Sequence, residues 1–72
     1  MKTFTATVET DYDTYLIDYK PDNIYSNRFS VSSSRRNAVY VYSLQDAMNQ
    51  IDFYNDQDIE RALLQSELEH NQ

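Results

Sequence analysis

The segment Ala38–Ile51, AVYVYSLQDAMNQI, changes its hydrophobic period in the middle, and this change decides the fold. In its first part valines and tyrosines alternate, so that Val39 and Val41 point to one side of an extended chain and the tyrosines to the other. From Leu44 onward, apolar residues recur three and four positions apart, which is the period of a helix face. The segment therefore predicts a strand that is followed at once by a helix, with the boundary at Ser43.

Ser43 is the predicted N-cap of this helix. Its hydroxyl can accept a backbone N–H of the first turn, and Asp46 places a carboxylate near the positive end of the helix dipole. The apolar residues that follow lie at positions i, i+3, i+4 and i+7 and form one stripe, suited to packing on a sheet. The stripe consists of Leu44, Ala47, Met48 and Ile51.

The rest of the chain continues the helical pattern. Asn55–Asp58 has the composition of a second helix start, with Asn55 or Asp56 as the cap, so helices are predicted over about 44–54 and 56–69. Because neither Gly nor Pro separates them, one bent helix is the alternative. The second stretch has two apolar edges on nearly opposite sides of the helix, of which one can face the sheet and the other requires a partner. The first edge comprises Ile59, Ala62 and Leu63, and the second comprises Leu64 and Leu68.

Three further alternating segments precede the strand predicted over about 38–42. They cover about 3–9, 14–19 and 28–32, and they are rich in the β-branched and aromatic residues that favour strands. Because side chains alternate between the two faces of a sheet, the alternation also predicts which of them point into the core. The predicted core residues of these strands include Val8, Tyr15, Ile17, Phe29 and Val31.

The connections between these strands contain no glycine and must turn with other residues. Thr10–Asp13 is a polar turn in which Asp can bond its own downstream backbone. Lys20–Asn23 ends the second strand, because Pro21 cannot donate to the ladder. Ser33–Ala38 is predicted as a hairpin loop in which Asn37 can take the left-handed conformation.

The length and composition indicate one small domain over residues 1–72. A chain of this size buries only about 60% of the surface that its unfolded form exposes, so it usually needs additional stabilisation. It has no Cys and one His, which leaves self-association or a larger partner in place of disulfides or a metal. The predicted fold class is α+β: a small antiparallel sheet of three to four strands with one or two C-terminal helices packed on one face.

The charge balance constrains the partner. Twelve acidic and six basic residues give a net charge of −6, which disfavours direct binding to nucleic acid or to an anionic membrane and favours a basic protein surface. The absence of glycine excludes the Gly-rich loops that cradle nucleotide phosphates, so no cofactor is expected. With no apolar run of membrane-spanning length, no signal-peptide core and no cysteine, the expected location is the cytoplasm.

Catalytic and metal sites are not expected. The carboxylates are scattered, no cysteine nucleophile is present, and a domain this small can hardly enclose a substrate pocket. The aspartates near the first turn lack the glycine and distal Glu of a calcium loop. Arg35 and Arg36 are interpreted as exposed residues at a hairpin tip, because no larger basic stripe accompanies them.

The acidic residues themselves form the best candidate for a functional surface. Asp11 and Asp13 lie two residues apart, which in an extended chain is about 6.8 Å, the axial step of two nucleotides on one DNA strand. Asp52, Asp56 and Glu60 recur every four residues, so a helix places these like charges in a row. Such a row is tolerated more easily when it meets cations in a complex.

The chain resembles the small acidic inhibitor proteins that phages encode against host machinery, including the anti-CRISPR type. A similarity to the phage T7 inhibitor of bacterial RNA polymerase rests on Phe4 and Ala6–Glu9 in the first strand, and on Ser43 with Asp46 and Ala47 at the strand-to-helix junction. The tyrosine-rich segment 19–42 and the helical end depart from that inhibitor. The resemblance implies a non-enzymatic inhibitor, located in the host bacterial cytoplasm, and transfers no functional residue.

These observations predict an inhibitor of a host nucleic-acid-handling protein, such as a CRISPR effector or nuclease. The inhibitor would bind a basic surface of that protein through its own acidic, tyrosine-rich surface, which mimics nucleic acid. The alternative is a homodimeric structural or regulatory protein with Leu64 and Leu68 at the dimer interface and the acids serving solubility alone. The candidate partner-binding residues are Asp11, Tyr12, Asp13, Asp18, Asp52, Asp56 and Glu60, with Tyr15 and Tyr19 as further tyrosines of that surface.

Overall fold

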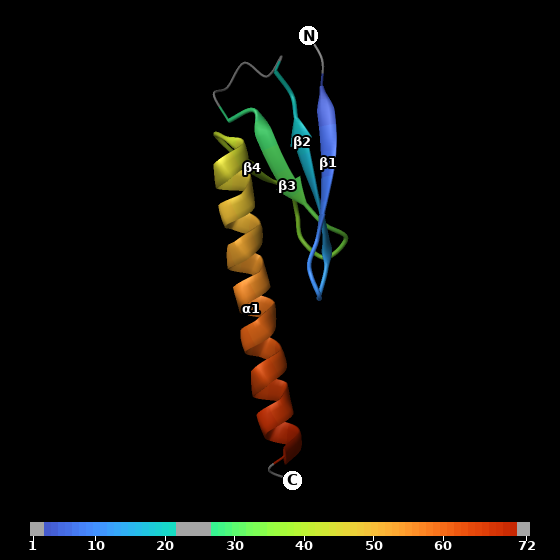
Figure 1. Cartoon of the computed structure of the whole chain (residues 1–72), viewed down its shortest axis with the longest axis vertical. Coiled ribbons are helices and arrows are strands. Elements are labelled where there is room, and N and C mark those ends of the chain that lie inside the picture. The colour runs from blue at the N-terminus through green and yellow to red at the C-terminus, as the bar shows by residue number, and fades with distance from the viewer. Residues whose placement is uncertain (1–2, 22–26, 71–72) are drawn as a thin grey trace.

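The computed structural model describes residues 3–21 and 27–70, with side chains up to residue 68. It confirms an α+β fold in which a four-stranded antiparallel sheet is followed by one long helix that packs on it (Figure 1). The elements are β1 (Phe4–Glu9), β2 (Thr14–Tyr19), β3 (Phe29–Ser32), β4 (Val39–Val41) and α1 (Leu44–His70). All four strands lie within the segments that the alternation predicts.

The sheet is a meander in which the strands lie in sequence order. Ile17 of β2 is paired with Ala6 on one side and with Val31 on the other, and Val31 is paired in turn with Val39. This register brings one set of apolar residues from all four strands to one face, because paired residues in neighbouring strands point to the same side. Tyr15, Ile17 and Val31 are almost completely buried there, as the alternation predicts.

The first turn is formed differently from the prediction. The Thr10 hydroxyl accepts the backbone N–H groups of Tyr12 and Asp13 at 3.2 and 3.1 Å, and the Thr10 N–H donates to the Asp13 carbonyl at 2.9 Å. Asp13 does bond its own downstream backbone, accepting the Thr14 N–H, but threonine closes the turn. A hydroxyl can serve here because it accepts several N–H groups from a short loop, as in other turns capped by Ser or Thr.

Of the other two connections, the β3–β4 loop differs from its prediction, and the connection after β2 lies partly outside the described residues. Ser33 and Arg36 exchange backbone hydrogen bonds at 3.3 and 3.4 Å, which closes the β3–β4 loop without a left-handed residue. The left-handed conformation predicted for Asn37 is wrong, since no residue in 3–21 or 27–70 has a positive φ. The turn predicted at Lys20–Asn23 lies partly outside the described residues, although Lys20 itself donates to the Arg28 carbonyl at 2.9 Å.

Helix α1 begins at the predicted cap and continues without a break. The Ser43 hydroxyl accepts the Asp46 N–H at 3.0 Å, which confirms its role as N-cap. The separate helix predicted over 56–69 does not exist, because Asn55 and Asp56 lie within the one helix. A side chain can cap a helix only where the backbone leaves the helical conformation, and this stretch has neither Gly nor Pro to cause that.

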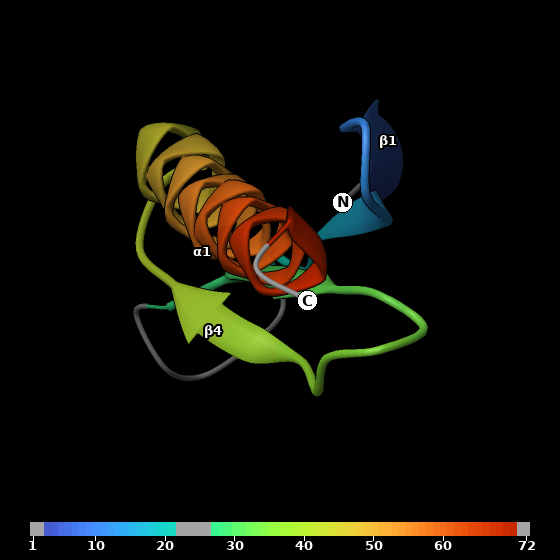
Figure 2. The same ribbon diagram turned by 90° about the horizontal axis from the view of Figure 1, so that it is seen from below.

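The hydrophobic core lies between the inner face of the sheet and the N-terminal half of α1. The helix contributes Ala47, Ile51 and Tyr54, which are buried, and Met48, which is half-buried. Seen from below in Figure 2, α1 lies on the inner side of the curved sheet, between β4 and β1. Leu44, predicted to join the core stripe, is 47% exposed, since it is the first residue of the helix and lies at the margin of the sheet.

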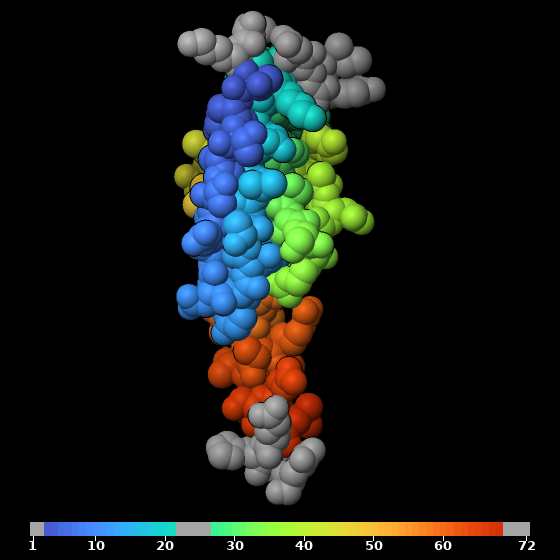
Figure 3. Space-filling model, turned by 90° about the vertical axis from the view of Figure 1, so that its right-hand side faces the viewer, coloured from blue at the N-terminus to red at the C-terminus, as the bar shows by residue number. Residues whose placement is uncertain are grey.

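The C-terminal half of α1 projects beyond the sheet (Figures 1 and 3). A helix of 27 residues is about 40 Å long, whereas a six-residue strand spans only about 20 Å. The molecule is consequently elongated, with principal extents of 56 × 18 × 17 Å. The prediction that this apolar edge faces the sheet is therefore wrong: Ile59 and Leu63 are 38% and 62% exposed, because the sheet ends near Ile59 and Leu63 lies on the side of the helix that faces away from it.

Candidate functional site

The candidate residues in and near the first turn fall into two groups: some side chains are exposed, and others are bound to neighbouring residues. Asp11 and Tyr12 are exposed at the tip of the β1–β2 hairpin. The Asp13 side chain is only 7% exposed, because its carboxylate is paired with Arg35 at 3.3 Å. Asp18 is half-buried and accepts a hydrogen bond of 2.7 Å from the Thr5 hydroxyl on the neighbouring strand. Asp11 and Asp13 thus do not form a free pair of carboxylates at phosphate spacing.

The two other tyrosines of the predicted surface point inward. Tyr15 is completely buried and its ring stacks on that of Tyr54, with the centroids 5.8 Å apart and 13° between the planes. Tyr19 is half-buried between Phe4 and Phe29, with ring centroids 5.5 and 4.8 Å away. Tyr15 therefore belongs to the core and cannot reach a partner, while Tyr19 mainly fills the end of the inner face.

Arg35 and Arg36 do not lie free at a hairpin tip, as their sequence position suggested. Both reach across to α1 and bind Asp58, whose side chain is only 3% exposed. Arg35 Nη2 lies 3.0 Å from one carboxylate oxygen and Arg36 Nη2 lies 3.5 Å from the other. Arg36 also covers the Tyr54 ring at 4.0 Å from its centroid, which is the geometry of a cation–π contact.

This arginine–aspartate cluster, made of Asp13, Arg35, Arg36 and Asp58, joins three separate parts of the chain. Asp13 comes from the β1–β2 turn, the two arginines come from the β3–β4 loop, and Asp58 comes from the middle of α1. The Tyr12 carbonyl accepts a further hydrogen bond from Arg35 at 3.4 Å. Because nearly buried charges must be paired, the cluster is structural and holds the helix against the two loops.

The pKa of Asp13 is lowered by this environment. Burial alone would raise the pKa of the carboxyl, but hydrogen bonds from the Ser33 side chain and the Thr14 N–H, together with the Arg35 charge, outweigh it. A carboxyl whose pKa is lowered in the folded state stabilises that state only while it is ionised. Its contribution is complete at neutral pH and is lost on acidification.

We therefore expect the free energy of unfolding to fall as the pH drops from about 5 through the ordinary Asp value of about 3.9 towards the lowered pKa. In the Asp13→Asn variant this part of the pH dependence should be absent, because the amide does not titrate. Urea unfolding followed by circular dichroism over this pH range measures the effect. Asp11→Asn is the matched control, since it changes an exposed carboxylate of the same turn. Equal pH profiles for wild type and Asp13→Asn would contradict the assignment.

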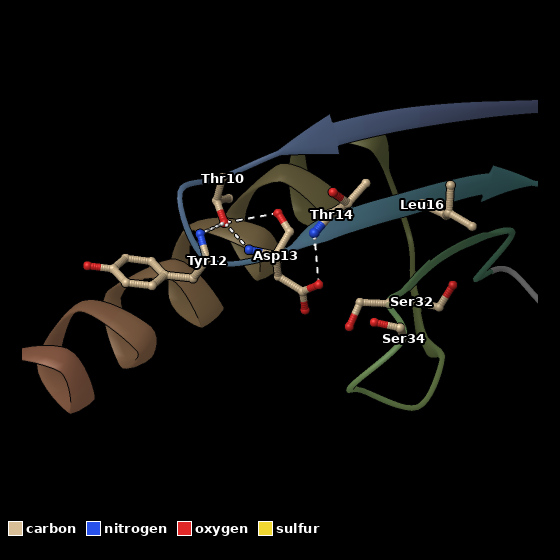
Figure 4. Close-up of a pocket in the computed structure, with 8 residues that line it drawn as sticks. Thr10, Tyr12, Asp13, Thr14, Leu16, Ser32 and Ser34 are labelled. Carbon is tan, nitrogen blue, oxygen red and sulfur yellow. Dashed lines mark hydrogen bonds between the residues drawn. The ribbon is translucent and has the colours of Figure 1, made fainter. Parts of the chain in front are cut away.

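A shallow groove of about 730 Å³ lies beside the same turn, between the β1–β2 hairpin and the start of the β3–β4 loop (Figure 4). Hydroxyl groups line most of it, and Leu16 is its exposed apolar residue. Figure 4 shows the Asp13 carboxylate on the side of the groove near Ser34, whereas the Tyr12 ring points away from it. Asp13 is already paired with Arg35, so the groove offers no free charged group of its own to a ligand. Its lining residues are Thr10, Tyr12, Asp13, Thr14, Leu16, Ser32, Ser33 and Ser34.

Helix α1 carries further exposed acidic residues. Asp52, Asp56, Glu60 and Glu67 are all exposed and form an acidic row along the side of the helix that faces away from the sheet. The row is about 22 Å long at 1.5 Å per residue, and its first three members are separated by about 6 Å each. The buried Asp58 lies at least about 120° away around the helix, since each residue turns by about 100°.

The seven predicted site residues therefore do not form one surface. Asp13 binds Arg35, which also binds Asp58, so the β1–β2 turn lies towards the sheet-facing side of α1. The acidic row lies on the opposite side of the helix. The exposed candidates therefore form two separate sites. One consists of Asp11 and Tyr12, and the other consists of Asp52, Asp56 and Glu60.

Sequence reasoning missed the arginine–aspartate cluster, although one signal for it was present. Asp58 continues the buried positions Ala47, Ile51 and Tyr54 at a spacing of four, three and four residues, so it lies on the core-facing side of the helix. A carboxylate at a core-facing position needs a cationic partner. Arg35 and Arg36 are two of only six basic residues in the chain and were the natural candidates.

Leu64 and Leu68, the predicted dimer residues, are 56% and 68% exposed on the projecting part of α1.

In the residues that the structure describes, no three potential ligand side chains converge as a metal site requires, and no helix is long and apolar enough to cross a membrane. Comparison of the chain with protein-family models, curated proteins and solved structures finds no match. The class that the geometry defines is thus a small α+β domain with a projecting helix.

Proposed function

We propose that this chain is a non-enzymatic binding protein that inhibits a nucleic-acid-handling protein, such as a nuclease or CRISPR effector, by docking its acidic row on a basic surface. One observation carries the proposal: four exposed carboxylates follow one side of a helix that the sheet leaves uncovered. The spacing of about 6 Å between Asp52, Asp56 and Glu60 is close to the axial step of about 6.8 Å for two nucleotides. The row can therefore occupy a groove that binds phosphates.

The surroundings of the row support an anion-like role. Arg35 and Arg36 are bound to Asp58 and do not neutralise the row, and Arg61 lies about 100° or more around the helix from each of its members. The three carboxylates at intervals of four residues repel one another by a few tenths of a kcal/mol per pair. A basic partner would relieve this repulsion and would be attracted at long range, which accelerates association.

The test compares charge reversal on the helix with the same charge change elsewhere. Proteins captured from a bacterial lysate by the immobilised chain are identified by mass spectrometry, and the affinity of each purified partner is then measured at increasing salt. We expect a nucleic-acid-handling partner, competition by DNA or RNA, weaker binding in high salt, and a loss of about 10- to 100-fold for Asp52→Lys with Asp56→Lys.

The matched control is Glu9→Lys with Asp11→Lys, which changes the net charge equally at the exposed end of β1 and its turn. This variant should bind with nearly wild-type affinity, because the β1–β2 turn lies on the other side of α1. Equal losses in both variants would show that net charge alone matters, and binding that is indifferent to salt and to the helix variant would refute the proposal.

A second candidate function is a homodimeric structural or regulatory protein, which the exposure of Leu64 and Leu68 favours. In that case the acidic row would serve solubility, and charge reversal of Asp52 and Asp56 would leave function unchanged. The two functions are compatible in one molecule.

A further inference from the structure

The molecule exposes more surface than a chain of its size should. Its accessible area is 5511 Å², about 800 Å² above the roughly 4,700 Å² expected for a compact monomer of 8.6 kDa. Its radius of gyration is 15.2 Å, against about 11 Å expected for 72 residues. The projecting half of α1 is the visible cause (Figure 3). An excess of about 800 Å² is close to what one partner contributes to a standard protein interface.

One side of the helix has the residues to use this surface. Phe53, Leu64 and Leu68 are each more than half exposed and lie within about 60° of one another around α1. Gln57, Glu60, Arg61 and Leu64 surround a hollow of about 300 Å³ between them. These four positions are i, i+3, i+4 and i+7, which is the arrangement of the four residues that receive one knob in helix–helix packing. The self-pairing face comprises Phe53, Gln57, Glu60, Arg61, Leu64 and Leu68.

This face is complementary to itself when two helices run antiparallel. With a twofold axis between Glu60 and Arg61, Glu60 of each copy lies opposite Arg61 of the other, so that two ion pairs form at the centre. The same register places Phe53 opposite Leu68 of the second copy and Gln57 opposite its Leu64. An antiparallel pair also puts each sheet beside the projecting end of the other helix, since every sheet covers only the N-terminal half of its own helix.

We propose that the chain forms an antiparallel homodimer through the self-pairing face of α1. A twofold axis requires that the same patch meets itself, and the pairing of Glu60 with Arg61 satisfies this requirement without placing like charges together. Asp52 and Asp56 lie about 90° or more around the helix from the centre of this face, whereas Glu60 belongs both to the acidic row and to the interface. The dimer rests on observations other than those behind the proposed inhibitory function, and it would leave Asp52 and Asp56 of each copy exposed.

The oligomeric state is measured by sedimentation equilibrium on the full chain over a range of concentrations. We expect a mass of twice 8.6 kDa for the wild type. Leu64→Glu should weaken dimerisation by about 100-fold or more, because each copy would have to bury a charge. Leu63→Glu is the matched control: Leu63 is the adjacent residue, is 62% exposed, and lies about 100° around the helix from Leu64, so its variant should remain a dimer.

Register and direction are tested by charge exchange and by cross-linking. Glu60→Arg should weaken the dimer by placing like charges together, and the additional change Arg61→Glu should restore it. The chain has no cysteine, so Phe53→Cys and Leu68→Cys can be mixed and oxidised. An antiparallel dimer gives disulfides between the two variants, whereas disulfides within each variant alone would show a parallel pair and overturn the proposal. A wild-type monomer at all concentrations, or equal effects of Leu63→Glu and Leu64→Glu in folded variants, would also overturn it.

Discussion

Asp58→Ala is expected to lower the free energy of unfolding by about 3–5 kcal/mol, which is a large part of the roughly 4–11 kcal/mol typical of a 72-residue domain. The side chain is 3% exposed and binds Arg35 and Arg36 through both of its oxygens. Its removal leaves the Arg36 guanidinium, which packs over the buried Tyr54 ring, without its carboxylate partner, and it leaves Arg35 with Asp13 alone. The loss of the pairing partner then exceeds the loss of the hydrogen bonds alone.

Urea unfolding at neutral pH measures this change. Asp56→Ala is the matched control, since Asp56 lies two residues away on the same helix and is exposed; its variant should change the stability by less than about 0.5 kcal/mol. If Asp58→Ala were as stable as the control, the cluster would be an ordinary surface ion pair and not the contact that holds the two loops to α1.

The second large effect is expected for Ile51→Ala, which should cost about 2–5 kcal/mol. Ile51 is 1% exposed and lies in the middle of the contact between α1 and the sheet, so its truncation leaves a cavity among well-packed neighbours. Tyr15, Ile17 and Val31 belong to the same cluster and cannot collapse into the space without disturbing the sheet register.

Ile59→Ala provides the comparison. Ile59 lies two turns further along the same helix but is 38% exposed, because it lies near the point where the sheet ends. We expect a loss of less than about 1 kcal/mol, measured by thermal or urea unfolding. Similar losses for both isoleucines would mean that the sheet also covers the second half of α1, contrary to the structure.

The strands and their faces could be predicted from the sequence, because both depend on local pattern. Alternation placed Tyr15, Ile17 and Val31 in the core, and all three are buried. The Ser43 cap was also predictable, since it requires only one hydroxyl and the three residues that follow. The turns were less predictable: Thr10 closes the first one where Asp was expected, because both residues can accept backbone N–H groups at that distance.

The candidate site was predicted only in part. The sequence indicated that Asp52, Asp56 and Glu60 share one side of a helix, and the structure leaves these residues exposed. The sequence did not distinguish them from Asp13, because it does not show which carboxylates have a cationic side chain as a partner. Arg35 lies 22 positions from Asp13 and 23 from Asp58, and only the folded chain brings the three together.

The sequence by itself determined the order of strands and helix, the inward residues of the sheet and the start of α1, because each follows from hydrophobic period or from contacts within a few residues. Tertiary structure decided how much of α1 is covered and which carboxylates are free. Both depend on long-range geometry: the sheet is about half as long as the helix, so the apolar residues beyond it stay exposed, and two loops meet at Asp58, so that carboxylate is buried.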